Sequence, residues 1–522
     1  MKRIVICCDG TWNDLEMRYI TNVGRLVQAL LPEAGSGASR VPQLIYYDDG
    51  VGAESAGVRR LIEGAFGRGI DTIIYEAYRF LCINYEPGDE VCLFGFSRGA
   101  FTVRSIAGMI SRVGLVPREQ LKYVPEALTH YRSKSPSDQA AFKKARARDI
   151  PIAVLGCWDT VGALGIPDKV SLLSIDKLTR KKYQFHDLSL ATGIKLAVHA
   201  LALDEHRKEF DATLMHKSKA GQKLVQTWFP GDHGCVGGGL WEKRGLSNHT
   251  LRWMVDTVRA HGIDLAVDWK RLHDDAMVDH SIFFDNGIAA IYGTRQRRLR
   301  EGVVAFGDLD DTALRRWAED GAYRYANLAK RFRQRLDTAA KQRTDVRVVP
   351  TADTALDVGD AAFVQVFARE ADNRSRILVR QGERYQLEVA RTQVWKDGDL
   401  DPCDILGWNT KKSGADAKRP WENGEPADHN ALSTRLIRLG GRKKLVQNAD
   451  WFQLVVGVDG DGFEAPAIAL PASETEPYRL SYEPGADGRL SLAANDLYSR
   501  IGVIDKYDNN AGWIWVKVTR TA

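Results

Sequence analysis

Short apolar runs alternate with stretches of helical periodicity over residues 1 to about 260, and this alternation restricts the fold more than any other feature of the chain. Buried-type runs of strand length, separated by amphipathic helices, are typical of a parallel sheet covered by helices on both faces. We therefore expect an α/β fold with a doubly wound, mostly parallel sheet. The predicted strands are Arg3–Cys8, Gln43–Tyr47, Glu90–Phe94, Ile152–Cys157 and Leu224–Phe229, and the predicted helices lie near 22–31, 69–85, 98–112 and 248–260.

A different pattern follows this region. Apolar residues recur near helical spacing from about 313 to 343, which predicts one amphipathic helix that closes the first domain. Beyond it, short alternating runs are separated by glycine- and aspartate-rich turns, which favours an all-β sandwich. We expect two domains, 1–343 and 344–522. The strands predicted in the second domain are Tyr385–Val389, Trp451–Val456, Tyr478–Tyr482 and Trp513–Val518.

Composition excludes several classes of protein. A formal net charge of +5 over 522 residues gives no general indication of nucleic-acid binding, and the basic run at 295–300 is interpreted as a solvated surface. No apolar run reaches the roughly 18 residues of a membrane span, and charge follows the N-terminal Met too soon for a secretory signal, so we expect synthesis in the cytoplasm. The seven cysteines show no metal-ligand spacing and are interpreted as reduced and structural.

The stretch GFSRGA, residues 95–100, stands between a predicted strand and a predicted helix. Gly95-Phe96-Ser97-Arg98-Gly99 fits the G-x-S-x-G pattern in the context that gives it meaning, because a tight strand-to-helix turn exposes the serine hydroxyl. Ser97 is therefore the candidate nucleophile, with a polar turn residue as the alternative. The backbone N–H of Arg98 is a candidate oxyanion donor, and amides of Gly10 or Thr11, after the first strand, are candidates for the second.

A serine nucleophile needs a base and an acid that orients the base, and in α/β-hydrolases the acid precedes the histidine along the chain. Asp159 directly follows one predicted strand, and His233 closely follows another. These two residues are the candidate acid and base. Asp204 and Asp232 are competing acids, the first interpreted as a salt-bridge partner of Arg207. His199 and His206 are placed on or beside a helical stretch, where an imidazole is usually a core or surface residue. The competing residues are His199, His206, Asp204 and Asp232.

Seven blocks in the first 340 residues together resemble the α/β-hydrolase phospholipase effectors of type VI secretion, the first type VI lipase-effector family. The blocks are CCDGTWND, TNVGRL, YYDDGVG, GFSRGA, CWDTVGALG, LALDEHRKEF and WFPGDHGCVGGG. The resemblance implies a serine hydrolase that cleaves acyl esters of membrane phospholipids through a triad of Ser97, Asp159 and His233, without a cofactor for catalysis. It also implies a toxin delivered by a secretion apparatus, with secretion-spike and immunity proteins as partners. The chain departs from the family at Gly234-Cys235, where members usually carry Ser-Asp.

Two other functions remain open from the sequence. The chain could be a carbohydrate- or partner-binding protein with a vestigial hydrolase domain, although an intact serine, acid and histidine in the right order speak against decay. It could also be an abortive-infection effector that degrades membranes inside its own cell. The acyl position cleaved and the substrate-binding residues are not given by the sequence.

The end of the second domain resembles the calcium-dependent galactophilic lectins of bacteria, whose jelly-roll ends in a similar Asn-Asp and Tyr-x-Asn-Asn pattern. Asp496, Asn509 and Asn510 could supply oxygen ligands to Ca²⁺, which prefers such donors. Turn geometry is the alternative role of the asparagines. A bound glycan is implied more weakly, and the tryptophans of this domain are interpreted either as a sugar platform or as core residues. These tryptophans are Trp395, Trp408, Trp421 and Trp513.

Overall fold

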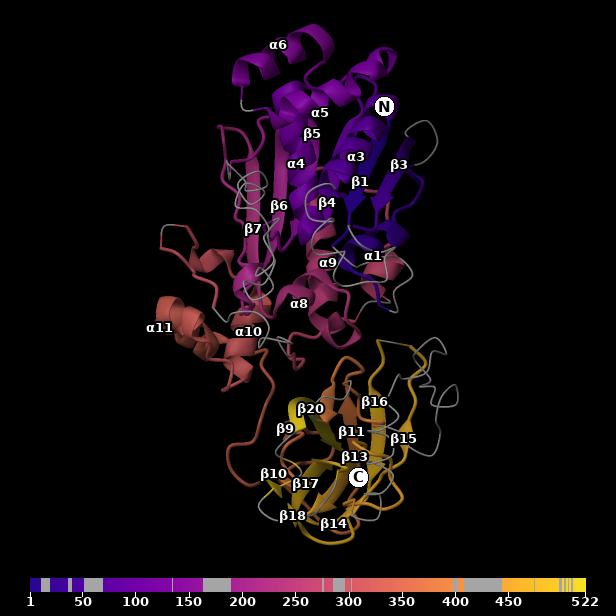
Figure 1. The fold of residues 1–522 in the computed structure, drawn as a ribbon. Coiled ribbons are helices and arrows are strands. Elements are labelled where there is room, and N and C mark those ends of the chain that lie inside the picture. Colours follow the sequence, from indigo (N-terminus) through magenta and orange to yellow (C-terminus); the bar gives the residue numbers. More distant parts are fainter. Residues whose placement is uncertain are drawn as a thin grey trace. The chain divides into compact units, whose positions relative to one another are not determined.

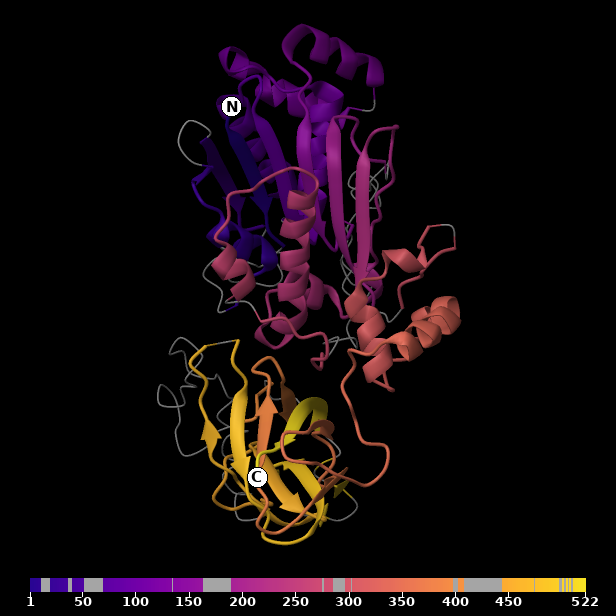
Figure 2. The same ribbon diagram turned by 180° about the vertical axis from the view of Figure 1, so that it is seen from behind.

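The structure is a computed structural model that divides into two compact units. The first unit comprises Met1–His280 and Asp285–Gln342, and the second comprises Ser281–Phe284 and Arg343–Ala522. Figures 1 and 2 show the helices and strands of both units. The structure describes all residues except 11–18, 36–39, 51–68, 134, 163–188, 275–276, 285–295, 302, 398–401, 408–443, 474, 497–499, 502–503, 506 and 508–509.

Seven strands among the described residues of the first unit form one sheet, in the order β2-β3-β1-β4-β5-β6-β7. All of them are parallel except β2, which pairs antiparallel with β3. The carboxyl ends of the parallel strands therefore lie along one edge. The strands are β1 (Arg3–Cys8), β2 (Glu33–Ala34), β3 (Val41–Asp48), β4 (Glu90–Phe96), β5 (Ile152–Trp158), β6 (Ile194–Ala202) and β7 (Lys223–Phe229).

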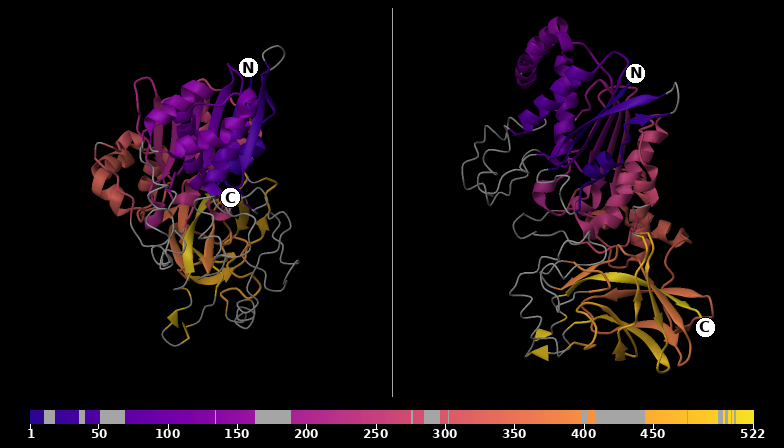
Figure 3. Two further views of the ribbon diagram at one scale, coloured as in Figure 1. Left: turned by 45° about the horizontal axis from the view of Figure 1, so that its top comes forward. Right: turned by 90° about the vertical axis from the view of Figure 1, so that its right-hand side faces the viewer.

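Helices cover both faces of this sheet (Figure 3, right). Alternate residues of β1 show why: Ile4 and Ile6 pack in one apolar cluster with α3 to α6, whereas Val5 and Cys7 pack in another with α1 and α9. This period of two is the geometry of a strand buried on both sides. The helices are α1 (Asn22–Ala29), α3 (Ile70–Asn84), α4 (Arg98–Val113), α5 (Val124–Arg132), α6 (Pro136–Arg146), α8 (His233–Gly237) and α9 (Arg244–Ala260).

The predicted α/β layout is confirmed, since all five predicted strands and all four predicted helices of this region are present within a few residues. Two strands of the sheet were not predicted, the two-residue edge strand β2 and the long strand β6. Ile194–Ala202 forms β6, and His199 lies on it, fully buried, so the assignment of His199 to a helical stretch was wrong. The sequence of this segment is apolar at nearly every position, and periodicity alone cannot separate a buried strand from a buried helix in such a run.

The single helix predicted over 313–343 is two helices, α10 (Asp311–Glu319) and α11 (Ala326–Gln342). The break follows Asp320, whose backbone is extended and whose carboxylate accepts the N–H of Ala322 at 2.9 Å. A short acidic side chain that bonds the backbone two residues ahead favours a turn over a continuing helix. Both helices still bury their apolar residues in one cluster beside the ends of β6 and β7.

Two sheets make up most of the second unit: β14-β13-β17-β10-β8, and β12-β20-β11-β16-β15 with β9 paired to β20. Apolar side chains from both sheets share one buried cluster, as expected for two facing sheets. Whether the connections are those of a jelly-roll stays a prediction. The strands are β8 (Thr354–Ala355), β9 (Ala361–Phe367), β10 (Asn373–Val379), β11 (Tyr385–Val389), β12 (Trp395–Asp397), β13 (Leu454–Val458), β14 (Asp461–Glu464), β15 (Ile468–Ala469), β16 (Tyr478–Tyr482), β17 (Gly488–Ala494), β18 (Arg500–Ile501), β19 (Ile504–Asp505) and β20 (Asn510–Arg520).

Two of the four tryptophans named from the sequence lie in the described part of this unit. Trp395 is fully buried in the shared core, whereas Trp513 is half-buried and packs its ring against Phe283 and Phe367. Trp408 and Trp421 lie outside the described residues. Trp395 is thus a core residue and is not available as a sugar platform.

Two further features of the chain concern its cysteines and the apolar character of its helices. All seven cysteines are buried and free of disulfide bonds, as expected of reduced, structural thiols. Burial raises the pKa of Cys92 and of Cys157 to about 12, which keeps both thiols protonated. Within the described ranges, no helix combines the length and the apolar character needed to cross a membrane.

Candidate active site

Ser97 occupies a sharp turn between β4 and α4. Its backbone angles, φ 57° and ψ −119°, lie in a region that non-glycine residues rarely adopt, and its N–H donates to the carbonyl oxygen of Trp158 at 3.0 Å. Its hydroxyl does not cap the helix that begins at Arg98. A strained serine whose hydroxyl is not used by its own helix is the geometry of a nucleophile elbow.

The two glycines of the motif are required by close backbone approaches. A methyl group on Gly95 would stand 2.5 Å from the carbonyl oxygen of Gly99, and one on Gly99 would stand 2.1 Å from that of Cys8. Both distances are far inside van der Waals contact, so no other residue fits at either position. The start of α4 is thereby pressed against the end of β1. The chain places β3 on one side of β1 and β4 on the other, and such a switch point is where open α/β sheets bind ligands.

Asp159 and His233 are in contact at the same edge of the sheet. Asp159 directly follows β5 and is fully buried, and its Oδ2 lies 2.6 Å from Nδ1 of His233. Since a carboxylate only accepts, Nδ1 carries the hydrogen and Nε2 is left as the acceptor. This is the tautomer that a general base for a serine hydroxyl requires.

Aromatic rings hold His233 beside the elbow. The imidazole lies 4.5 Å, centroid to centroid, from the ring of Phe96, which precedes Ser97, and 5.0 Å from the ring of Phe210. Its backbone N–H donates to Oε2 of Glu205 at 3.2 Å. Among the described residues no hydrogen bond joins the Ser97 hydroxyl to His233, and such bonds often tighten only when substrate binds.

Arg297 also binds the Asp159 carboxylate, and sequence reasoning missed it. The guanidinium donates from Nη1 to Oδ1 at 2.5 Å and from Nη2 to Oδ2 at 2.8 Å. Burial alone would raise the pKa of Asp159, but the charge of Arg297 and the hydrogen bonds from His233 and Arg297 hold it below its usual value.

The interpretation of the basic run at 295–300 as a solvated surface was therefore wrong for Arg297, which is 3% exposed. The signal that could have revealed it is the apolar Leu299, because Arg297 and Leu299 are buried while Arg298 and Arg300 are exposed. Arg295 lies outside the described residues.

The oxyanion candidates stand at the ends of β1 and β4. Arg98 begins α4, so its N–H belongs to the first turn of a helix, where unpaired amides favour negative charge. The N–H of Gly10 donates to Oδ1 of Asp9 at 2.6 Å, and Thr11 lies outside the described residues. The carboxylate of Asp9 also accepts from the hydroxyls of Thr21 and Tyr47. Burial raises the pKa of Asp9 to about 6, and these bonds oppose the rise.

The competing acids have structural partners. Asp204 accepts from the N–H of Gly231 at 2.6 Å and from the hydroxyl of Tyr323 at 2.9 Å. The expectation of a salt bridge between Asp204 and Arg207 is wrong, because Arg207 pairs with the neighbouring Glu205 at 2.7 Å.

Asp232 caps α8 through the N–H of Cys235 and pairs with Lys243 at 2.5 Å. Among the competing histidines, His199 accepts the N–H of Thr160 at Nε2, and burial lowers its pKa to about 3. His206 is half-buried, and its ring meets that of Tyr325 edge to face.

Two of the three candidate calcium ligands lie together in the second unit. Asn510 donates from Nδ2 to Oδ2 of Asp496 at 2.9 Å and to the carbonyl oxygen of Ala368 at 3.1 Å. Oδ1 of Asn510 is buried without a hydrogen-bond partner among the described residues, so an amide oxygen lies ready beside a carboxylate. Such a donor pair suits a hard cation. Asn509 lies outside the described residues, and no group of three or more Asp, Glu, His or Cys side chains that could hold a metal ion is found within them.

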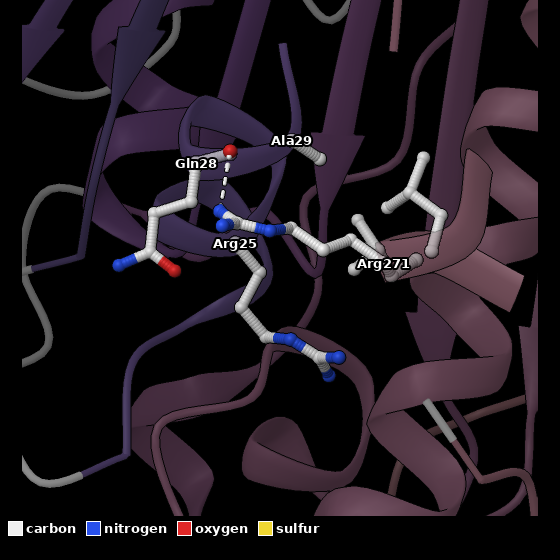
Figure 4. A pocket seen from close by; sticks show the side chains of 6 residues that line it. Arg25, Gln28, Ala29 and Arg271 are labelled. Atoms are coloured by element: carbon white, nitrogen blue, oxygen red, sulfur yellow. Dashed lines mark hydrogen bonds between the residues drawn. The ribbon is translucent and has the colours of Figure 1, made fainter. Parts of the chain in front are cut away.

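Figure 4 shows a pocket elsewhere on the first unit, between α1, α9 and the segment around 271. Arg271 crosses it and donates to the carbonyl oxygen of Gln28 at 2.9 Å. None of the candidate catalytic residues lines this pocket, whose lining is Arg25, Gln28, Ala29, Leu251, Arg271 and Leu272.

A doubly wound sheet with a strained serine after a central strand and an acid–histidine pair at the same edge belongs to the hydrolase class of α/β proteins. Residues 2–257 match the family model described as the catalytic domain of Tle1-like phospholipase effectors of type VI secretion. This part of the chain belongs to that family.

Similar proteins cover parts of the chain. An uncharacterized protein of Saccharomyces cerevisiae is 33% identical over 235 residues, which are 40% of this chain and 32% of that protein. The Tle1 effector bound to the VgrG spike is a structural neighbour with 19% identity, a TM-score of 0.29, and coverage of 46% of this chain and 51% of its own. An uncharacterized protein from Pseudomonas aeruginosa has 17% identity and a TM-score of 0.31, with coverage of 54% and 49%. The chain thus spans about a third to a half of the lengths of these proteins.

Proposed function

We propose that the first unit is a serine hydrolase that cleaves acyl esters of membrane phospholipids, as a phospholipase A does. The observation that carries the proposal is the imidazole of His233, which is hydrogen-bonded to Asp159 at 2.6 Å and packed against the ring of Phe96, the neighbour of Ser97. Membership of residues 2–257 in the phospholipase effector family supports the choice of substrate.

In this mechanism Nε2 of His233 accepts the hydroxyl proton of Ser97 while Oγ attacks the acyl carbonyl carbon. His233 then gives the proton to the departing alcohol of the lysophospholipid. Water, activated by the same imidazole, releases the fatty acid from Ser97. Asp159 remains ionised throughout, because Arg297 and His233 hold its pKa low, and it keeps the hydrogen on Nδ1.

Backbone amides of Arg98 and of Gly10 or Thr11 would hold the oxyanion, each donor being worth on the order of 3 kcal/mol. The N–H of Gly10 now donates to the carboxylate of Asp9. To serve as the second donor, it has to turn from Asp9 toward the substrate oxygen when the acyl chain binds.

The family also supports a proposal about setting: a toxin delivered to a target cell, with a secretion-spike protein and an immunity protein as partners. The Tle1 effector in the structural comparison is bound to the VgrG spike. Co-expression with a candidate spike and co-purification tests this part separately from the enzyme activity, and failure to co-purify would leave the hydrolase proposal in place.

The test of the activity compares wild type with Ser97→Ala and with a control variant, Ser111→Ala. Ser111 lies on α4, the helix that follows Ser97, and its hydroxyl forms an exposed hydrogen bond with that of Thr192. We expect fatty acid and lysophospholipid from vesicles treated with wild type and Ser111→Ala, and a loss of several powers of ten in rate for Ser97→Ala. A fluorophosphonate probe should label Ser97 and nothing else. Wild-type rates for a folded Ser97→Ala protein would contradict Ser97 as the nucleophile. A folded wild type that neither hydrolyses the lipid nor reacts with the probe would favour a binding protein with a vestigial hydrolase domain.

For the second unit we propose that Asp496, Asn509 and Asn510 bind Ca²⁺. We also propose that the bound Ca²⁺ helps this unit to bind a glycan. The buried, unpaired Oδ1 of Asn510 beside the Asp496 carboxylate supports this proposal. Calorimetric titration of the full chain with Ca²⁺ should show binding that Asp496→Asn removes, whereas binding that survives this substitution contradicts the assignment. Screening the calcium-loaded protein for binding to galactosides tests the proposal that this unit binds a glycan.

A further inference from the structure

The carboxylate of Asp159 is saturated by donors. Oδ1 accepts from the N–H of Ala202 at 3.0 Å and from Nη1 of Arg297, and Oδ2 accepts from Nδ1 of His233 and from Nη2 of Arg297. Two donors on each oxygen fill the four acceptor positions of a carboxylate. Any rotation of Asp159 about its last side-chain bond would therefore break several hydrogen bonds at once.

Arg297 also donates to two backbone carbonyl oxygens. Nη1 donates to the carbonyl oxygen of Ala202 at 2.8 Å, and Nη2 donates to that of Phe210 at 2.5 Å. The first carbonyl ends β6, and the second belongs to the residue whose ring packs against His233. The guanidinium thus ties together Asp159, the end of a central strand, and one wall of the imidazole site.

We propose that Arg297 is a positioning residue of the hydrolase: its planar fork fixes Asp159 so that one oxygen faces Nδ1 of His233. The inference rests on the proposed function. An acid that orients a base usually also stabilises the base in its protonated form. Here the paired guanidinium preserves the orientation of Asp159 on which the base depends.

Other charges face the same group and remain unchanged when only residue 297 is altered. Glu205 accepts the N–H of His233 and is paired with Arg207, and Asp232 caps α8 and is paired with Lys243. His199 lies near Asp159, Arg104 and Arg297, and Asp211 lies near Arg297. A change in kcat among variants at 297 therefore reports the contacts made from that position.

The test uses the full chain and measures kcat and KM for ester hydrolysis across pH 4.5 to 9, together with thermal unfolding. Arg297→Lys keeps the charge but loses the fork. We expect its kcat to fall by about tenfold to a hundredfold, since small errors of position cost that much, with KM and the acid limb of the pH profile unchanged. Arg297→Gln removes the charge as well, and its kcat should fall at least as far as that of Arg297→Lys.

Arg298→Gln is the matched control, because Arg298 is the exposed neighbour in the same run, and it should behave as wild type. Wild-type kcat in Arg297→Lys would overturn the positioning role. Should Arg297→Gln fail to fold, the lysine variant still decides. Inactive wild type would overturn the proposed function and this inference with it, whereas active wild type with silent 297 variants would overturn the inference alone.

Discussion

Gly99 lies so close to the end of β1 that a methyl group on its Cα would stand 2.1 Å from the carbonyl oxygen of Cys8 and 2.4 Å from that of Asp9. Both neighbours are backbone atoms of a central, fully buried strand and its continuation, so neither can move without distorting the sheet. The packing of α4 on β1, and with it the height of Ser97 above the sheet edge, depends on the absence of a side chain at this position.

Gly99→Ala should therefore destabilise the first unit and abolish the proposed activity, because α4 has to shift away from β1 and carries Ser97 with it. Gly108→Ala is the matched control on the same helix. Its added methyl group would meet nothing closer than 3.5 Å and should stabilise the helix by up to about 1 kcal/mol. Urea unfolding and ester hydrolysis of both variants check this prediction. Equal stability of the two alanine variants would contradict it.

A second prediction concerns the buried carboxyl group of Asp204. Burial raises its pKa from 3.8 to about 7, against the bonds from Gly231 and Tyr323. Between these two values the folded protein keeps a proton that the unfolded chain has lost, so stability falls as pH rises through this window, by at most about 4 kcal/mol. In Asp204→Asn this fall should disappear, which urea unfolding at pH 5 and pH 8 measures.

The control for this pH effect is Asp211→Asn, since Asp211 is exposed. Its unfolding free energy should change between pH 5 and pH 8 by the same amount as that of wild type. An Asp204→Asn protein that loses as much stability as wild type between these two pH values would show that Asp204 is already ionised at pH 5 in the folded state.

The cysteines give a third prediction. All seven are buried and none forms a disulfide bond, so the native protein should not react with a thiol reagent such as Ellman's reagent, and it should release about seven thiols when unfolded. Reducing agent should leave the unfolding temperature unchanged. Fast labelling of a native thiol would reveal local opening, and peptide mapping would name the cysteine.

The sequence was sufficient for those parts of the site that depend on local pattern. Apolar runs located the strands, and a carboxylate and an imidazole that follow parallel strands had to meet at one edge of the sheet. The contact between Asp159 and His233, at 2.6 Å, agrees with that reasoning. The elbow was predictable for the same reason, because its glycines and its strand and helix are neighbours in sequence.

The parts that were missed depend on partners far away along the chain. Arg297 contacts Asp159 across 138 positions, and nothing within the basic run indicates a buried carboxylate at that distance. The use of the Gly10 amide depends on which way the side chain of Asp9 turns. His199 was misassigned because β6 is apolar at nearly every position, so that only the neighbouring strands β5 and β7 decide its structure.

The last prediction concerns Lys243, whose Nζ lies 2.5 Å from Oδ2 of Asp232, with both side chains buried. Asp232 caps α8, the helix that begins with His233. Lys243→Met should leave a buried carboxylate without its cation, cost about 3–5 kcal/mol of stability, and lower activity by loosening α8. Arg40→Met is the control, because Arg40 and Glu33 form an exposed pair worth no more than about 1 kcal/mol. Similar urea midpoints for the two variants would show that Asp232 does not need Lys243.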